Sequence, residues 1–232
     1  MTITFITGAN KGLGRETARR LVDLGHTVLV GARDTEQGER TAAALGARFV
    51  RIDVTDDASV AAAARDVADR EGVVDVLVNN AGIHGPSGDA AALTGADALA
   101  VFDVNVAGVV RTTTAFLPLL RRSADPVVIN VSSGTGSLAH THDPARPESS
   151  VVVPLYTASK AALTMLTTQY AKALPDVRVN AADPGYTATD LNGHSGPQTV
   201  TEGTDAVVGL ATEPPGSGSG RFVDRSGEIA WS

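Results

Sequence analysis

Short apolar runs alternate along the chain with longer stretches that are rich in alanine and charged residues. The runs at residues 3–7, 27–32 and 76–79 consist mainly of valine, isoleucine, leucine and threonine, and alanine-rich stretches such as 58–70 lie between them. Strands separated by about 10 to 15 helical residues indicate βαβ units and a parallel sheet. The run at 127–129 lacks polar alternation, as do central strands buried on both faces. The pattern therefore predicts an α/β protein.

The same alternation continues toward the end of the chain. Helical patterns cover about 97–122 and 155–174, and "RFV" at 221–223 predicts one last strand. The stretch "EPPGSGSG" at 213–220 has the composition of a linker, but only a dozen residues follow it, so we interpret it as a flexible surface loop. No repeat or linker divides the chain, which predicts one domain over 1–232.

Composition and charge narrow the class of protein. Hydrophobic residues make up 43% of the chain and charged residues 19%, and the formal net charge is −7. The basic residues are scattered, which argues against a nucleic-acid partner. There is no unbroken apolar run of about 18 residues and no signal-peptide pattern, so we expect no membrane partner and a cytoplasmic location. The absence of cysteine excludes disulfides, thiol catalysis and zinc–cysteine sites.

The first predicted strand leads into a glycine-rich turn. In "TGANKGLG" (7–14), Gly8, Gly12 and Gly14 precede a helical pattern. Glycines at such a turn allow a pyrophosphate to approach backbone amides at the start of a helix. A tight strand-to-helix turn without a ligand is the alternative.

Five motifs in a fixed order resemble the short-chain dehydrogenase/reductase family over nearly the whole chain. They are "TGANKGLG" (7–14), "NNAG" (79–82), "NVSS" (130–133), "YTASK" (156–160) and "DPGYTAT" (183–189). The first and last of these, together with "GARD" (31–34), look most like the carbonyl reductase branch. The resemblance implies a single Rossmann-type doubly wound parallel sheet with helices on both faces. It also implies a nicotinamide cofactor and hydride transfer to or from a small carbonyl or alcohol substrate.

The spacing within "YTASK" places Tyr156 and Lys160 four residues apart on a predicted helix, where they share a face. A nearby ammonium group favours phenolate, as would the positive ring of an oxidised nicotinamide. We therefore expect Tyr156 to exchange a proton near neutral pH. The alternative is an aromatic residue at a helix start beside a solvated lysine.

The family resemblance implies a role for each residue of this group. Tyr156 matches the general acid that protonates the carbonyl oxygen, and Lys160 matches the lysine that also binds the nicotinamide ribose. Ser133 matches the serine that orients and polarises the carbonyl, whereas Ser132 fits less well. Asn105, in "DVNVAG", matches a helix asparagine that helps to hold a water-linked proton relay.

The phosphate state of the cofactor is predicted from the end of the second strand. Enzymes that prefer NAD usually carry an acid there, whereas this strand is followed by Arg33. Arginine suits a 2′-phosphate, and Lys11 in the glycine turn supplies a second positive charge. We therefore predict NADP(H), although Asp34 follows at once and both cations have solvated surface charges as an alternative.

Further cofactor contacts follow from the resemblance. Asp53 matches an adenine contact, with a loop or helix-capping aspartate as the alternative. Asn79 begins a motif that both supports the sheet and lines the cofactor, and Thr187 and Thr189 match contacts to the carboxamide or belong to a plain turn. The predicted cofactor-binding residues are Gly8, Asn10, Lys11, Gly12, Leu13, Gly14, Arg33, Asp53, Val54, Asn80, Ala81, Gly82, Tyr156, Lys160, Pro184, Gly185, Thr187 and Thr189.

An inserted segment separates "NVSS" from "YTASK". It spans 134–155, and its role is open, although the carbonyl reductase branch also enlarges this region. His140, His142 and Asp143 lie in it, but an i,i+2 histidine pair in a loop rich in proline and serine is typical of solvated side chains, so we assign no metal. The insertion could obstruct the helix-mediated interface of tetrameric family members, and a monomer and a homo-oligomer both remain open.

Two function classes remain. The main prediction is an NADPH-dependent oxidoreductase acting on a carbonyl or alcohol, because Asn105, Ser133, Tyr156 and Lys160 are all present. The alternative is a non-catalytic NADP(H)-binding redox sensor on the same fold. The polar segment "LNGHSGPQTVTEG" (191–203) is too short for a large apolar lid and predicts a compact or open substrate site. The substrate, its stereochemistry and the direction of reaction stay undetermined.

Overall fold

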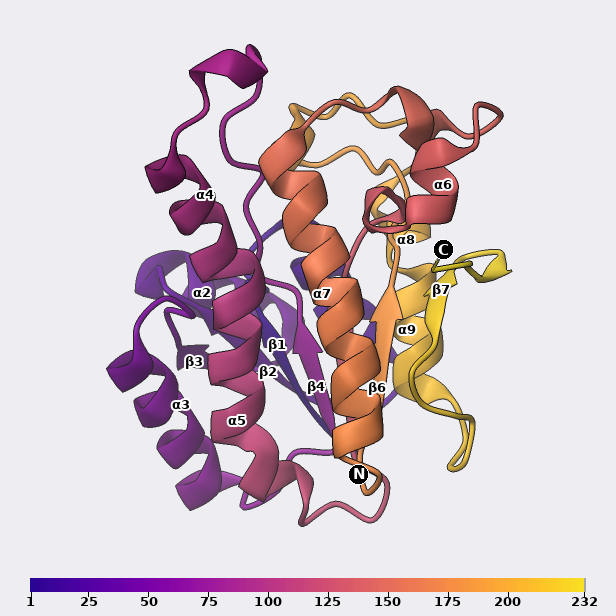
Figure 1. Cartoon of the computed structure of the whole chain (residues 1–232). Helices are drawn as coiled ribbons and strands as arrows, with labels where there is room; N and C mark the ends of the chain where they lie inside the picture. The colour runs from indigo at the N-terminus through magenta and orange to yellow at the C-terminus, as the bar shows by residue number, and fades with distance from the viewer. Residues whose placement is uncertain (232) are drawn as a thin grey trace.

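Eight strands form one sheet in the computed structural model, which describes residues 1–231 (Figure 1). The strand order is β3-β2-β1-β4-β5-β6-β7-β8, and only the last pair is antiparallel. The strands are β1 (Ile3–Thr7), β2 (Thr27–Ala32), β3 (Arg48–Arg51), β4 (Val76–Asn79), β5 (Val127–Val131), β6 (Arg178–Ala182), β7 (Phe222–Asp224) and β8 (Gly227–Glu228). The predicted α/β fold with a doubly wound parallel sheet is confirmed.

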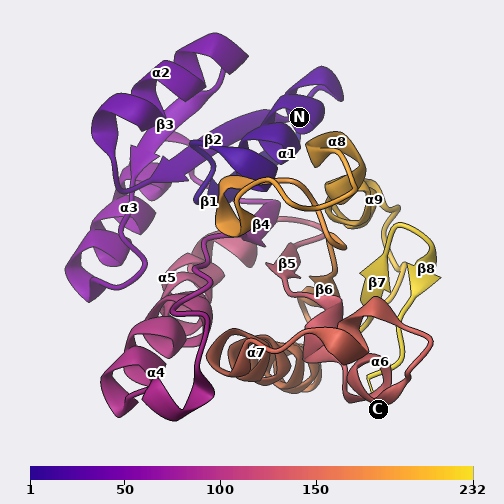
Figure 2. The same ribbon diagram turned by 90° about the horizontal axis from the view of Figure 1, so that it is seen from above.

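Helices cover both faces of this sheet (Figure 2). One face packs on α1, α2 and α9, and the other packs on α3, α5 and α7. The helices are α1 (Gly12–Asp23), α2 (Thr35–Leu45), α3 (Asp57–Arg70), α4 (Gly95–Phe102), α5 (Gly108–Leu120), α6 (Leu138–His142), α7 (Pro154–Ala173), α8 (Val200–Gly203) and α9 (Asp205–Thr212). The short helical turns are η1 (Ala90–Ala92), η2 (Asp103–Ala107), η3 (Gly134–Gly136), η4 (Pro147–Ser150) and η5 (Asp190–Asn192).

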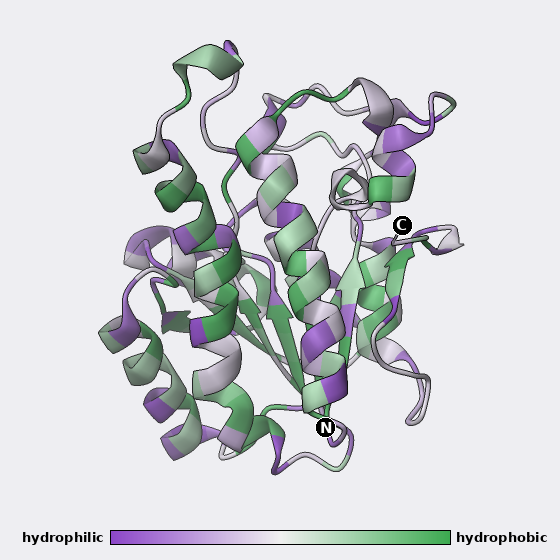
Figure 3. Cartoon of the chain, in the orientation of Figure 1, coloured by the Kyte–Doolittle hydropathy of each residue, from purple (hydrophilic) through white to green (hydrophobic). Residues whose placement is uncertain are grey.

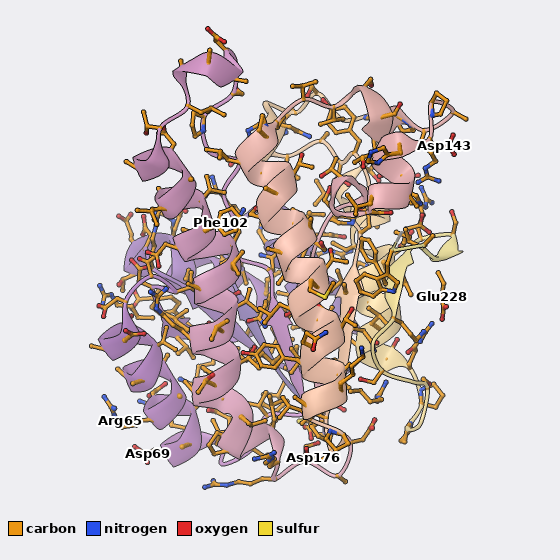
Figure 4. All side chains as sticks on the ribbon, viewed as in Figure 1. Arg65, Asp69, Phe102, Asp143, Asp176 and Glu228 are labelled. Atoms are coloured by element: carbon orange, nitrogen blue, oxygen red, sulfur yellow. The ribbon has the colours of Figure 1, made fainter. Side chains whose placement is uncertain are left out.

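The strands are apolar on both faces because both faces are covered. An apolar cluster lies on each face of the sheet. In β1, Phe5 is fully buried in one cluster and Ile6 in the other. The Phe5 ring packs on Phe116 of α5, with ring centroids 4.4 Å apart. Burial of such a side chain contributes roughly 1.5–3 kcal/mol. Apolar residues accordingly fill the centre of the molecule in Figure 3, and the labelled charged side chains of Figure 4 lie at its periphery.

The helix predicted over 97–122 begins and ends two residues earlier than expected and is not uniform. It runs from Gly95 to Leu120 through α4, η2 and α5, and η2 is a π-helical turn that contains Asn105. By length and composition alone this helix could also cross a membrane, although it contains no unbroken apolar run of about 18 residues. Its apolar residues Phe116 and Leu120 are fully buried in the apolar cluster that contains Phe5, on the face of the sheet covered by α3, α5 and α7. Packing on the sheet thus accounts for its apolar character.

The chain end differs from the single last strand that the sequence predicts. Strand β7 turns back into β8, and Trp231 then packs on Phe222 with ring centroids 5.1 Å apart. The inserted segment meets this end, because the Ser137 hydroxyl donates to the Ala230 carbonyl at 2.6 Å and the Leu138 amide donates to the Trp231 carbonyl at 3.1 Å. The insertion is therefore anchored to the C-terminal segment through α6.

Candidate active site

The glycine turn lies where β1 ends and α1 begins, and Asn80 fastens it to the end of β4. Gly8 and Gly12 have φ angles of 64° and 53°, which favour glycine. The Asn80 side-chain amide donates to the carbonyls of Thr7 and Gly8 at 2.8 and 3.1 Å. A Cβ on Gly14 would stand 2.5 Å from that amide nitrogen, so a larger residue would push these segments apart.

A cavity of about 600 Å³ runs along this turn. Most of the predicted cofactor contacts line it, namely Gly8, Asn10, Lys11, Gly12, Leu13, Gly14, Arg33, Asp53, Val54, Asn80, Ala81, Gly82 and Thr189. Tyr156, Lys160, Pro184, Gly185 and Thr187 are not among its lining residues. The sequence missed other lining residues, including Gln37, His84, Asp190 and Leu191.

Three polar residues near the motifs point into the fold instead. The Asn79 side chain donates to Asn130 on the neighbouring strand at 2.9 Å, and Ser132 contacts the Lys160 carbonyl at 3.3 Å. Thr187 is buried and donates to the Pro184 carbonyl at 2.9 Å. Asn79 and Ser132 therefore hold the sheet and α7 together, and Thr187 has the plain-turn role that the sequence left open.

Asp53 lies in the turn after β3 and borders the cavity, and its contact with adenine stays a prediction. It lines the cavity, and its carboxylate accepts hydrogen bonds from the amide and hydroxyl of Thr55 at 3.0 and 2.7 Å. These bonds lower the pKa of Asp53. The carboxylate therefore shapes the turn after β3 and borders the cavity.

Lys11 and Arg33, the two predicted phosphate ligands, differ in their surroundings. The Lys11 ammonium pairs with the Asp190 carboxylate at 2.9 Å, which joins the glycine turn to the segment after β6. This pair is exposed on both sides, and solvent weakens such pairs. Arg33 is exposed, lines the cavity and forms no ion pair with residues 1–231. Arg33 is thus the more available of the two cations.

The four residues predicted to be catalytic come together at the carboxyl ends of β4 and β5. Lys160 is buried, and its ammonium lies 5.5 Å from the centroid of the Tyr156 ring. The ammonium donates to the Val131 carbonyl at 2.7 Å. A Cβ on Gly82 would stand 3.3 Å from Asn105 Oδ1 and 3.7 Å from Lys160 Nζ, so those two side chains meet at this glycine.

The side chain of Asn105 joins two segments. Its oxygen accepts from the Ile83 amide at 2.8 Å, and its nitrogen donates to the Ile83 carbonyl and to the Ser159 hydroxyl, both at 2.9 Å. Ser159 in turn donates to the Tyr156 carbonyl at 2.7 Å. Asn105 therefore positions the loop after β4 against the first turn of α7. The π-helical turn brings it there, as such turns often do at functional sites.

Burial and a nearby carboxylate set the electrostatics around Tyr156. Burial and the Asp183 carboxylate raise the pKa of Tyr156 to about 12, and a hydrogen bond with Ser133 opposes them. Burial lowers the pKa of Lys160 to about 8, and Asp183 acts in the opposite direction. In the chain without cofactor these effects disfavour the phenolate, and the expected proton exchange near neutral pH stays a prediction. At neutral pH Tyr156 is a phenol, as a proton donor must be.

The inserted segment carries an ionic cluster. Arg146 contacts Glu148 and His140 at 3.2 and 3.1 Å, whereas His142 contacts the Leu138 carbonyl of its own helix at 2.8 Å. A Cβ on Gly134 would stand 2.6 Å from Glu148 and 2.8 Å from Asp183, so both carboxyls flank the residue after Ser133. Within residues 1–231 no three metal-ligating side chains are grouped in a way that would hold an ion.

Comparison with known proteins is consistent with this geometry. The sequence profile of short chain dehydrogenases matches residues 2–199. The chain belongs to the short-chain dehydrogenase family. It is 37% identical to the short-chain dehydrogenase anuI of Penicillium roqueforti, over 96% of this chain and 93% of that protein. It is 31% identical to (-)-isopiperitenone reductase of Mentha piperita, over 97% of both.

Solved structures of the family are also similar. NADPH-bound carbonyl reductase from chicken fatty liver has a TM-score of 0.88 and 28% identity, with both chains fully covered. Salutaridine reductase from Papaver somniferum has a TM-score of 0.85 and 27% identity, over 96% of this chain and 99% of that one. The family membership and the Rossmann-type architecture inferred from the motifs are confirmed.

Asp183 provides a test of the electrostatics at Tyr156. Burial raises the pKa of Asp183 itself. Above that pKa its carboxylate is a buried negative charge that disfavours phenolate, so we expect Asp183→Asn to lower the pKa of Tyr156. The alkaline limit of carbonyl reduction should move to lower pH, and alcohol oxidation should begin at lower pH. The substituted amide would keep an oxygen to accept the Gly185 amide, which now donates to Asp183 at 2.9 Å.

The measurement is the pH profile of turnover in both directions. Asp176→Asn is the matched control, since Asp176 is exposed and pairs with Arg121 at the opposite end of the molecule (Figure 4). Identical profiles for the Asp183 variant and the wild type would contradict the proposed influence of Asp183 on Tyr156.

Proposed function

We propose that this chain is an NADPH-dependent oxidoreductase that reduces a carbonyl compound, of the carbonyl reductase type. The observation that carries the proposal is the grouping of Tyr156, Lys160 and Asn105 next to a cavity lined by the glycine turn and Arg33. The similarity to a carbonyl reductase that binds NADPH supports both the cofactor and the branch.

The residues present fit a dinucleotide. The glycine turn and the start of α1 suit a pyrophosphate, and Arg33 with Lys11 suits a 2′-phosphate at the adenosine end. Thr189 and Gly82 line the same cavity, and the Lys160 ammonium lies next to Gly82. When bound, the nicotinamide would supply the hydride in reduction or accept it in oxidation.

The chain's own residues handle the proton. In reduction the Tyr156 phenol would give its proton to the carbonyl oxygen as that oxygen gains negative charge. Ser133 would hold the oxygen, since its hydroxyl lies 3.0 Å from that of Thr135 and close enough to the phenol to lower the pKa of Tyr156. The Lys160 ammonium, 5.5 Å from the ring centroid, would stabilise the phenolate that remains. Asn105 would maintain the arrangement through Ile83 and Ser159.

A panel of ketones, aldehydes and quinones with NADPH tests this function, with cofactor absorbance as the readout. We expect turnover of several carbonyl compounds and a preference for NADPH over NADH. A redox sensor would bind NADPH, which a fluorescence titration detects, and would turn over none of them. Turnover only of alcohols with the oxidised cofactor would reverse the proposed direction. The cytoplasmic location and the oligomeric state stay predictions.

A further inference from the structure

The imidazole of His84 is stacked on the ring of Tyr156. Their ring centroids are 5.2 Å apart and the ring planes differ by 25°. His84 is half-buried and lines the cavity that also contains the glycine turn. A side chain that touches the proton donor and also borders this cavity is in position to contact a carbonyl compound held by Tyr156.

The backbone on one side of His84 is fixed by the residue that positions Tyr156. Asn105 binds both the amide and the carbonyl of Ile83, the residue before His84, at 2.8 and 2.9 Å. The same side chain reaches the Tyr156 carbonyl through Ser159. One buried asparagine thus fixes the two backbone segments that carry these rings relative to each other.

The backbone on the other side is fixed by a close approach to α4. Gly85 has a φ of 73°, and a Cβ there would stand 2.4 Å from Cγ2 of Val101, which is fully buried. Only glycine fits at this position without displacing the helix. The backbone that carries His84 is therefore held in place on both sides, which favours a preorganised binding site.

The ring of His84 has a hydrogen-bonding edge. Nδ1 lies 3.4 Å from the Gly85 carbonyl, a contact in which Nδ1–H donates weakly. With the proton on Nδ1, Nε2 can accept from a hydroxyl group, and in the protonated ring it donates to a carbonyl oxygen. A neighbouring hydroxyl on the substrate would therefore find a partner in either protonation state, and a neighbouring carbonyl oxygen would find one in the protonated ring.

Resting on the proposed function, we propose that His84 is a specificity-determining residue that binds a second oxygen of the substrate. The reacting oxygen binds Tyr156 and Ser133, and the second oxygen binds His84. Because the ring centroids are only 5.2 Å apart, the substrate class that suits both hydrogen-bonding groups has two oxygens close together, as in α- and β-hydroxyketones and diketones. Simple ketones leave His84 without a partner, so the preferred substrate class is the dioxygenated carbonyl compound.

The test compares acetoin with 2-butanone, which differ by one hydroxyl beside the carbonyl. We expect the wild type to favour acetoin by about threefold to tenfold in kcat/KM, the effect of one hydrogen bond. His84→Phe keeps a stacked ring but removes both nitrogens. It should bring the ratio close to one, mainly by reducing activity on acetoin. His142→Phe, at an exposed histidine of α6, should leave the ratio unchanged.

A second readout does not depend on turnover. In nitrogen-15 spectra of the chain, acetoin should shift the Nε2 resonance of His84, identified by its loss in His84→Phe, and 2-butanone should shift it much less. Turnover with equal ratios in wild type and His84→Phe would overturn this inference and leave the proposed function standing. Bound NADPH with no turnover of any carbonyl would overturn both.

Discussion

Replacing Tyr156 with phenylalanine is expected to lower turnover by about 10²- to 10⁴-fold, the usual contribution of a general acid. Phenylalanine keeps the ring that packs on His84 and faces the Lys160 ammonium, so the geometry of the site should persist. Only the hydroxyl, the group proposed to donate the proton, is lost. Steady-state assays with any substrate found in the carbonyl panel measure the fall, and a fluorescence titration with NADPH measures whether cofactor binding survives.

Tyr170→Phe is the matched control for this experiment. Tyr170 lies near the other end of α7 and packs, half-buried, against the apolar cluster that contains Phe5. The same hydroxyl deletion there should leave turnover within about twofold, as substitutions away from such features usually do. Near-normal turnover in Tyr156→Phe would remove Tyr156 from its assigned role, even if NADPH still binds.

Replacing Arg33 with aspartate is expected to weaken NADPH binding by about tenfold or more and to change NADH binding much less. Charge-assisted hydrogen bonds contribute roughly 1.5–3 kcal/mol, and NADPH would lose such a bond and gain a repelling carboxylate. Because Lys11 already pairs with Asp190, Lys11→Ala alone should have the smaller effect. The double variant should extend the shift without simple additivity, since both side chains would address one phosphate.

Dissociation constants for NADPH and NADH, measured at low and high salt for the wild type and each variant, test this prediction. The preference of the wild type for NADPH should weaken with salt, which screens exposed charges such as Arg33. Arg40→Asp serves as the control, because Arg40 is also exposed but pairs with Glu36 on α2 and does not line the cavity. A wild type that favours NADH, or an Arg33 variant that affects both cofactors equally, would show that the phosphate-site prediction is wrong.

The fold could be predicted from the sequence because its strands are buried on both faces. Strand β1, with Phe5 on one face and Ile6 on the other, shows adjacent apolar residues in the sequence in place of a strict apolar–polar alternation. The pairing of Tyr156 with Lys160 could be predicted for a similar reason, since helix geometry relates residues four apart. Strand β8 is only two residues long and carries no comparable apolar signal.

Contacts between distant segments could not be predicted in the same way. The pair of Lys11 with Asp190 joins residues 179 positions apart, and His84 meets Tyr156 only because Asn105 links their segments. The directions of the pKa shifts could not be predicted for a related reason. Spacing shows that Tyr156 and Lys160 share a face, but their burial, which is the largest cause of both shifts, depends on the packed chain.

The burial of Lys160 also affects the free energy of unfolding. Its pKa is lowered from 10.5 to about 8 in the folded chain, so folding disfavours the protonated side chain. For a base shifted this way, the cost is absent above the unfolded pKa and is reached in full once the pH falls below about 8. Each pKa unit corresponds to about 1.36 kcal/mol, which makes the cost on the order of 3 kcal/mol at neutral pH. Domains have free energies of unfolding of only about 5–15 kcal/mol. The buried lysine that we propose stabilises the phenolate therefore lowers the free energy of unfolding by a substantial fraction.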